Sequence, residues 1–96
     1  MVTFADAGTE DIYNGRSSKA LRKVCPASLL QAARRKLFQV ASVDQLDQLR
    51  IPPGNRLEAL HGDRTRQQSI RINERYRICF RWNDGDPVDV EIVDYH

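Results

Sequence analysis

The tripeptide Pro52-Pro53-Gly54 divides this chain into two halves with different hydrophobic periods. Before it, apolar residues recur every three or four positions, which is the spacing of an amphipathic helix. After it, apolar and polar residues alternate, which is the spacing of a strand with one buried face. A chain of 96 residues can enclose one small core. We therefore expect a single α+β domain over residues 1–96, a small antiparallel sheet with two or three N-terminal helices packed on one face.

The first half is expected to contain two main helices. Thr9 is predicted to cap the first one, a short helix that Gly15 ends. Residues 16–24 are polar and basic, and we predict a loop with some helical character there. A longer helix is predicted over residues 26–41, because a proline suits its first turn and its apolar residues form one stripe. Residues 43–49 are predicted to add a further helical turn.

The second half is predicted to form two successive hairpins. Asn73-Glu74 and Asp84-Gly85 favour tight turns between strands. The expected strands cover residues 56–60, 69–72, 75–82 and 88–93, and residues 2–5 are predicted to add a further short strand. The helical stripe and the apolar strand positions together form the predicted core: Phe4, Ile12, Leu30, Ala33, Leu37, Val40, Leu57, Ile70, Ile72, Tyr76, Ile78, Phe80, Trp82, Val90 and Ile92.

Arginine is concentrated in the predicted strands. Six arginines lie between Arg64 and Arg81, and the segment contains a single acid, Glu74. The net charge of the whole chain is only +2, so the distribution of charge is more informative than its sum. A guanidinium group binds phosphate or carboxylate oxygens through a planar fork that is always charged. The segment is therefore a candidate binding surface for an anionic ligand.

Strand alternation separates these arginines from the predicted helices. If the aromatic and aliphatic residues face the helices, Arg71, Arg77 and Arg81 lie on the open face of the sheet. In the last strand, Asp89 and Glu91 are expected on the same face of the sheet, so Arg81 has partners for cross-strand ion pairs. The other arginines, Arg64, Arg71 and Arg77, have fewer obvious partners and are better candidates for binding a ligand.

The residues Asp94-Tyr95-His96 supply groups that can transfer or orient a proton. Cleavage of RNA without a metal requires a deprotonated 2′-oxygen, a stabilised phosphorane and a protonated 5′-oxygen. Histidine titrates near neutral pH, so we interpret His96 as a proton-transfer group that Asp94 or Tyr95 orients. Arg77 is predicted to stabilise the phosphorane. His61 is a candidate for the second proton transfer; the alternative is that His61 is only a solvent-exposed residue of a turn. Strand alternation places Tyr95 on the face opposite Asp94 and His96.

The cysteines and the apolar content indicate neither a metal site nor a membrane protein. Cys25 and Cys79 lack the spacing of a zinc site or a disulfide framework, so we expect no metal and no cofactor. The first six residues lack the basic and apolar regions of a signal peptide. No stretch approaches the roughly eighteen apolar residues of a membrane span. We expect a cytoplasmic protein without membrane contacts.

Two stretches and the last three residues resemble the HigB group of the RelE/ParE toxin superfamily, also called plasmid-maintenance killer proteins. The stretches are residues 54–64, GNRLEALHGDR, and residues 69–82, SIRINERYRICFRW. The resemblance implies a RelE-like fold and a toxin of a type II toxin–antitoxin pair. Such a toxin enters the ribosomal A site and cleaves mRNA, so it is a ribosome-dependent endoribonuclease that stops translation and growth. The implied partners are the ribosome, mRNA and a HigA-like helix-turn-helix antitoxin, with operator DNA bound only through the antitoxin.

The resemblance also implies roles for individual residues. The segment Asp94-Tyr95-His96 matches the catalytic tail of the family, and Arg77 matches its strand arginine after the hairpin aromatic. Two positions depart from the family pattern: His61 stands where lysine is common, and Glu58 stands where some members have a catalytic histidine. The arginines predicted to bind RNA are Arg64, Arg66 and Arg71, of which Arg64 matches the Gly-Asp-Arg turn.

Two other classes of function remain possible interpretations. A ParE-like gyrase inhibitor needs no proton-transfer group, so the Asp-Tyr-His segment argues against it. A non-catalytic module that binds RNA or the ribosome would use the same arginines only as phosphate contacts. For the antitoxin, we predict a surface on the helical layer that includes Arg34, Arg35 and Lys36, with a merely solvated helix face as the alternative.

Overall fold

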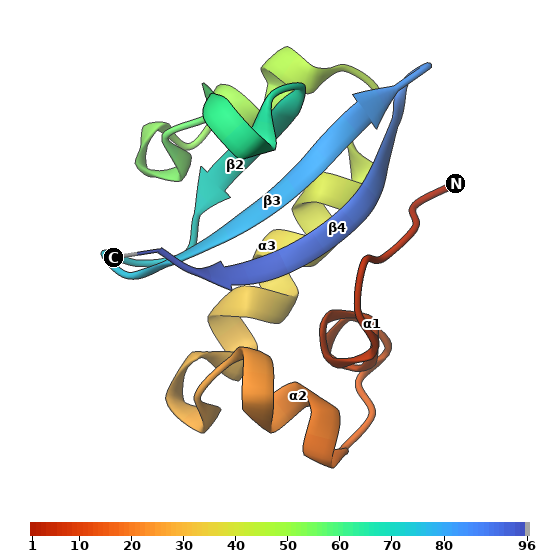
Figure 1. Cartoon of the computed structure of the whole chain (residues 1–96), viewed down its shortest axis with the longest axis vertical. Helices are drawn as coiled ribbons and strands as arrows, with labels where there is room; N and C mark the ends of the chain where they lie inside the picture. Colours follow the sequence, from red (N-terminus) through yellow and green to blue (C-terminus); the bar gives the residue numbers. More distant parts are fainter. Residues whose placement is uncertain (96) are drawn as a thin grey trace.

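The second half of the chain forms an antiparallel sheet of four strands in the order β1-β2-β3-β4 (Figure 1). In this computed structural model, which describes residues 1–95, the strands are β1 (Glu58–Ala59), β2 (Gln67–Arg71), β3 (Tyr76–Asn83) and β4 (Asp86–Asp94). The two predicted hairpins are confirmed, because β2 pairs with β3 and β3 with β4 in antiparallel register. The sheet thus follows from the alternation and the turn residues of the second half.

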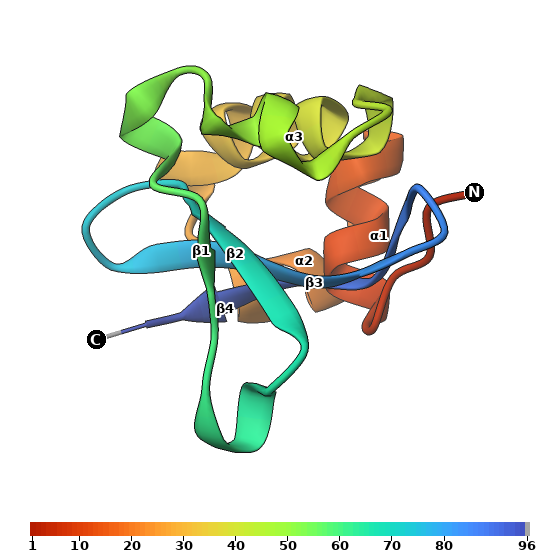
Figure 2. The same cartoon turned by 90° about the horizontal axis from the view of Figure 1, so that it is seen from above.

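The first half supplies three α-helices on one side of this sheet. They are α1 (Ala7–Asn14), α2 (Lys19–Val24) and α3 (Leu30–Ser42). Figures 1 and 2 show α3 running along one side of the strands, with α1 beside it. Short 3-10 turns connect the elements: η1 (Ala27–Leu29), η2 (Leu46–Arg50), η3 (Pro53–Asn55) and η4 (Gly62–Arg64). The α+β architecture is confirmed, and within residues 1–95 no helix has the length and hydropathy to cross a lipid bilayer.

Two predictions about the first half were wrong in detail. Asp6, not Thr9, caps α1, since its Oδ1 accepts a hydrogen bond of 2.6 Å from the backbone N–H of Thr9. The helical character expected within residues 16–24 is a complete helix rather than part of a loop, because Ser18 caps α2 and accepts a hydrogen bond of 3.3 Å from the backbone N–H of Leu21. Gly15 ends α1 as predicted, with a left-handed φ of 72°. A serine cap can begin a helix even where the following residues are basic.

The hydrophobic core lies between the helices and the sheet. Phe80, Leu37 and Ile78 are among its fully buried side chains. Every residue of the predicted core belongs to this cluster or packs against it. The prediction missed Leu21, Cys25 and Leu49, which are also buried there. They belong to α2 and η2, the elements that the hydrophobic pattern defined least clearly.

A β-bulge bends the last hairpin and joins it to the N-terminal segment. The register of β3 and β4 shifts between Cys79 and Arg81, and Asp89 has a left-handed φ of 54°. The backbone N–H of Asp89 donates a hydrogen bond of 2.9 Å to the side-chain oxygen of Thr3. The strand predicted at residues 2–5 is reduced to one parallel bridge, between Phe4 and Val90. The bulge thereby replaces a ladder hydrogen bond with a contact to the N-terminal segment.

A fully buried amide, Asn55, fixes the connection between the two halves. Its Nδ2 donates hydrogen bonds to the backbone carbonyl of Leu49 at 3.0 Å and to the side chain of Gln39 at 3.1 Å. Its Oδ1 accepts a hydrogen bond from the ammonium group of Lys36. Desolvation lowers the pKa of Lys36. Lys36 therefore holds this connection and is not the exposed charge that the sequence suggested.

Candidate functional site

One residue from each strand forms a row across the face of the sheet opposite the helices. The row is Glu58, Ser69, Cys79 and Glu91, as the pairing of the four strands defines. Ser69 and Cys79 are fully buried although they point away from the helical layer. Burial raises the pKa of the Cys79 thiol, and nearby arginines oppose this shift. The centre of the open face is thus covered by long basic side chains.

Arg77 is the best-anchored of these basic side chains. Its Nε donates a hydrogen bond of 2.8 Å to Ser69 Oγ, and its Nη2 donates one of 2.8 Å to the backbone carbonyl of Arg56. Nη2 also lies 3.3 Å from a carboxylate oxygen of Glu58. Arg56 presents its carbonyl from a left-handed conformation, with φ 47°. Among residues 1–95 the remaining nitrogen, Nη1, has no partner, and 13% of the side chain is exposed.

Arg64 approaches the same face from η4. Its Nη1 donates hydrogen bonds to Glu91 at 2.6 Å and to Gln67 at 2.9 Å. The hydrogen bond to Glu91 raises the pKa of Arg64, so its charge is permanent. Its Nε and Nη2 have no partner within residues 1–95. The expectation of few partners was wrong for both Arg64 and Arg77, because Glu91 pairs with Arg64 and Glu58 pairs with Arg77.

Tyr95 lies beside Arg77. The guanidinium carbon of Arg77 is 6.0 Å from the centroid of the Tyr95 ring. Arg64 and Arg77 both lie close enough to the buried Cys79 thiol to oppose the rise in its pKa. The backbone N–H of Tyr95 donates a hydrogen bond of 2.6 Å to the carbonyl of Arg75. Arg64, Arg77 and Tyr95 therefore form one cluster, hereafter the open-face cluster.

Asp94 does not join this cluster. Its two carboxylate oxygens accept hydrogen bonds of 2.7 Å each from Arg75, at the end of the β2–β3 hairpin. Asp94 and Tyr95 thus point to different faces, as alternation predicted. The other predicted proton-transfer group of this segment, His96, lies outside the described residues. Arg75 was not predicted to take part, although its position two residues before Arg77 was the available signal.

The remaining candidate residues lie around the open-face cluster. His61 is exposed and directly precedes η4. Arg71 donates a hydrogen bond of 3.0 Å from Nε to the carbonyl of Asn73, and Arg66 is exposed with a left-handed φ of 76°. The predicted cross-strand pair of Arg81 is present, with Asp89 as the partner at 2.5 Å.

Register explains why sequence reasoning missed part of the site. Ser69 and Gln67 bind the two arginines of the cluster, yet in the sequence they look like ordinary polar positions of a strand. Their roles depend on which residues of β2 face β3, and a turn of unknown length sets that register. Glu58 was noted only as a departure from a family pattern, because its partner Arg77 is nineteen positions away.

The open-face cluster is suited to binding a phosphodiester. Two anchored guanidinium groups present unpaired nitrogens, and permanent cations of this kind bind phosphate oxygens in a fixed orientation. The thiol of Cys79 is buried and its pKa is raised, so it is a poor nucleophile. In the part of the chain that is described, no group of three His, Cys, Asp or Glu residues is arranged to hold a metal ion.

Comparisons with known proteins define the class to which this fold and site belong. Residues 2–96 match the family described as the RelE-like toxin of the type II toxin–antitoxin system HigB. Toxin HigB-1 of Vibrio cholerae serotype O1 is 38% identical over 82 residues, which cover 85% of this chain and 83% of that toxin. An uncharacterized protein of Haemophilus influenzae is 31% identical over 61 residues, 64% of this chain and 60% of that protein.

A solved structure has the same fold. The YoeB-YefM complex from Staphylococcus aureus contains a chain that matches with a TM-score of 0.56 and 17% identity, covering 100% of this chain and 95% of that one. The family match identifies the chain as a RelE-like toxin of a type II toxin–antitoxin system, and the solved structure shows the same fold. Within that class, the chain belongs to the HigB family.

Proposed function

We propose that this toxin is a ribosome-dependent endoribonuclease that cleaves mRNA in the ribosomal A site and thereby stops translation. The observation that carries the proposal is the pair of anchored arginines, Arg64 and Arg77, on the uncovered sheet face beside Tyr95. Each holds an acid or a neighbouring polar group with one edge of its guanidinium and leaves another edge for a phosphate. Such fixed cations lower a barrier without reorganising during the reaction.

The proposed reaction is attack of the ribose 2′-oxygen on the adjacent phosphorus, with departure of the 5′-oxygen. Arg77 stabilises the extra negative charge of the phosphorane, and Arg64 holds the neighbouring phosphate. His96 transfers the proton to or from the reacting oxygens, and Tyr95 orients the ribose or the leaving group. Asp94 is a positioning residue, because its ion pair with Arg75 fixes the backbone just before His96.

The surrounding residues are assigned to binding. Arg71, which pairs across the strands with Arg77, and the exposed Arg66, which lines a hollow with Arg81, contact the RNA backbone on either side of the reacting phosphate. His61 takes the second proton-transfer role in place of the usual lysine. The partners of the toxin are then the ribosome with its mRNA and a HigA-like antitoxin, and the antitoxin alone contacts operator DNA.

The test is cleavage of a defined mRNA on purified bacterial ribosomes, read by primer extension. His96→Gln is expected to abolish cleavage. Arg77→Ala is expected to lower kcat/KM by about 10²–10³, the usual effect of removing one fixed donor to a developing anion. Arg81→Ala is the matched control, because Arg81 is an arginine of the same strand that is paired with Asp89. It should cleave like the wild type.

The results separate this function from the other two classes. Cleavage by the wild type on ribosomes, with none in their absence, supports the proposal. If His96→Gln arrests growth as strongly as the wild type, proton transfer by His96 is wrong. Measuring plasmid supercoiling and mRNA integrity after brief expression then distinguishes gyrase inhibition, which changes supercoiling, from simple blocking of the ribosome.

A further inference from the structure

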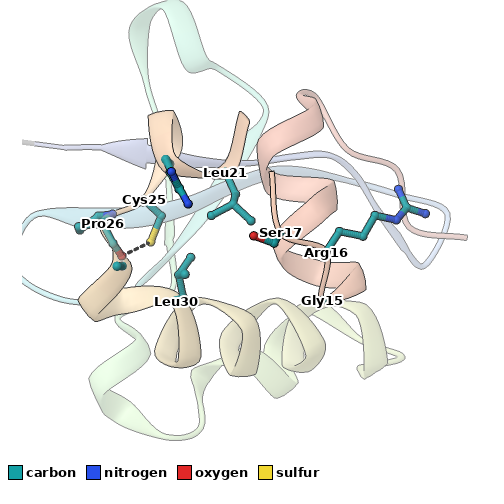
Figure 3. Close-up of a pocket in the computed structure, with 9 residues that line it drawn as sticks. Gly15, Arg16, Ser17, Leu21, Cys25, Pro26 and Leu30 are labelled. Carbon is teal, nitrogen blue, oxygen red and sulfur yellow. Dashed lines mark hydrogen bonds between the residues drawn. The ribbon is translucent and has the colours of Figure 1, made fainter. Parts of the chain in front are cut away.

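The helical layer contains an apolar groove on the side of the molecule away from the open-face cluster. The groove has a volume of about 480 Å³ and lies where the end of α1, α2, η1 and the start of α3 meet (Figure 3). Leu21, Cys25 and Leu30 converge on it in Figure 3, and Pro26 and Ala27 complete its apolar lining. The thiol of Cys25 contacts the carbonyl of Pro26 at 3.6 Å, so the floor presents no unmet polar group at that point.

The rim of this groove is basic. Arg16 and Arg22 line it, and Arg34 lines an adjoining hollow of about 160 Å³ that shares Gly15, Leu21 and Leu30 with the groove. The side chain of Arg16 is 65% exposed, although it lies 3.6 Å from Asp11. Asp11 is the acid that pairs with Arg16, and residues 12–43 contain seven Lys and Arg and no Asp or Glu, so the rim keeps an excess of positive charge. A partner with carboxylates would relieve it.

Apolar lining and basic rim together indicate the chemistry of the occupant. An RNA backbone would match the arginines but would leave the exposed apolar surface of Pro26, Ala27 and Leu30 uncovered. An amphipathic protein segment with apolar side chains on one face and Asp or Glu beside them matches both features. A segment of this kind can bury leucine-sized side chains in the groove, as helices do in grooves of other proteins.

We propose that this groove is the docking site for an acidic, amphipathic segment of the antitoxin. The proposal rests on the toxin–antitoxin function and moves the predicted surface from residues 34–36 to the junction of α1, α2 and α3. It follows that an antitoxin segment bound there leaves Arg64, Arg77 and Tyr95 uncovered, since the helices and the open-face cluster lie on opposite faces of the sheet.

Two variants and one matched control test the groove. Arg16→Glu/Arg22→Glu reverses the charge of the rim, and Ala27→Trp fills the groove from an exposed position. Lys19→Glu/Lys23→Glu changes the net charge by the same amount on exposed positions of α2 that do not line the groove. Each purified toxin is titrated with the purified protein encoded by the reading frame next to the toxin gene. Melting temperatures show which variants are folded.

The expected result is a Kd at least about tenfold higher for both groove variants and a change below about threefold for the control. Folded groove variants that bind within threefold of the wild type would overturn the proposal, and so would a control that weakens binding as much as the rim reversal. Weaker ribosome binding by the rim variant with unchanged antitoxin binding would assign the groove to RNA and also overturn it. Without the antitoxin, the groove variants should cleave mRNA on ribosomes as the wild type does. The cleavage assay thus tests the proposed function, and the binding assay tests the groove.

Discussion

Replacing Asn55 by alanine tests whether one buried amide fixes the connection between the helical half and the sheet. Asn55 is fully buried, and its side chain bonds the Leu49 carbonyl, Gln39 and Lys36. Alanine removes all of these bonds at once. Leu49 would then keep a backbone carbonyl in a buried region without its side-chain partner, and Lys36 would lose the acceptor of its desolvated ammonium group.

The expected loss of stability is about 2–4 kcal/mol. Each neutral hydrogen bond contributes about 1 kcal/mol, and an unsatisfied buried acceptor costs about 1–3 kcal/mol. The Lys36 ammonium group can regain water once Asn55 is gone, so the predicted loss of unfolding free energy stays at the lower end of these ranges. Small domains are stable by about 5–15 kcal/mol, so the change is a large part of the total. For a domain of this size, it corresponds to a fall in Tm of roughly 10–25 °C.

Urea unfolding followed by circular dichroism measures this change directly. Gln39→Ala is the matched control, because it removes one acceptor of the same amide and an exposed hydrogen bond of 2.6 Å to the Ile51 carbonyl, but leaves the buried bond to Leu49 intact. It should lose about 1 kcal/mol, because neither bond leaves a buried group unsatisfied. An Asn55→Ala protein that is destabilised by less than about 1 kcal/mol would refute the structural role assigned to this amide.

Two further predictions concern the two faces of the sheet. Phe80→Ala should lower the free energy of unfolding by roughly 3–5 kcal/mol, since Phe80 is fully buried beneath the helices; an unshifted melting temperature would show that the strand faces are inverted. Cys25 and Cys79 should react slowly with a thiol reagent at pH 8 until denaturant is added, because burial raises both pKa values above the ordinary 9.0. Rapid labelling of the native protein would contradict the burial. The stability linked to these thiols is present below pH 9.0 and is lost as the pH rises through their higher folded-state pKa values. Unfolding curves measured at alkaline pH would detect this loss.

The sequence predicted the sheet better than the helices because alternation is a stronger signal than a short cap. Ile70, Ile78 and Phe80 follow a period of two, and their burial follows from it. The six residues of α2 have no comparable period, and their helical state depends on the Ser18 cap and on burial of Leu21 in a tertiary core. Propensity alone cannot foresee such tertiary support.

The candidate site was predicted in its residue types but not in its internal contacts. Arg77 and Tyr95 were both named from the sequence, and alternation correctly separated Tyr95 from Asp94. The anchoring of Arg77 by Glu58 and by the Arg56 carbonyl depends on a left-handed Arg56, which is uncommon for a residue other than glycine. Asp89, at the bulge, also has a left-handed conformation that could not be predicted, because contacts with the surrounding structure and not the residue type determine the backbone there.

The parallel bridge between Phe4 and Val90 also determines how this sheet meets other chains. Ala5 donates a backbone hydrogen bond of 2.9 Å to the carbonyl of Val90, whose own N–H donates one of 2.9 Å to Thr3. The outer edge of β4 is therefore partly occupied by the chain's own N-terminal segment, and β1, at the opposite edge, is only two residues long. Exposed strand edges are the usual starting points of aggregation and of strand exchange between copies. A chain that adds a strand here must first displace residues 3–5 or accept a very short ladder, so both edges of the sheet resist pairing with another copy.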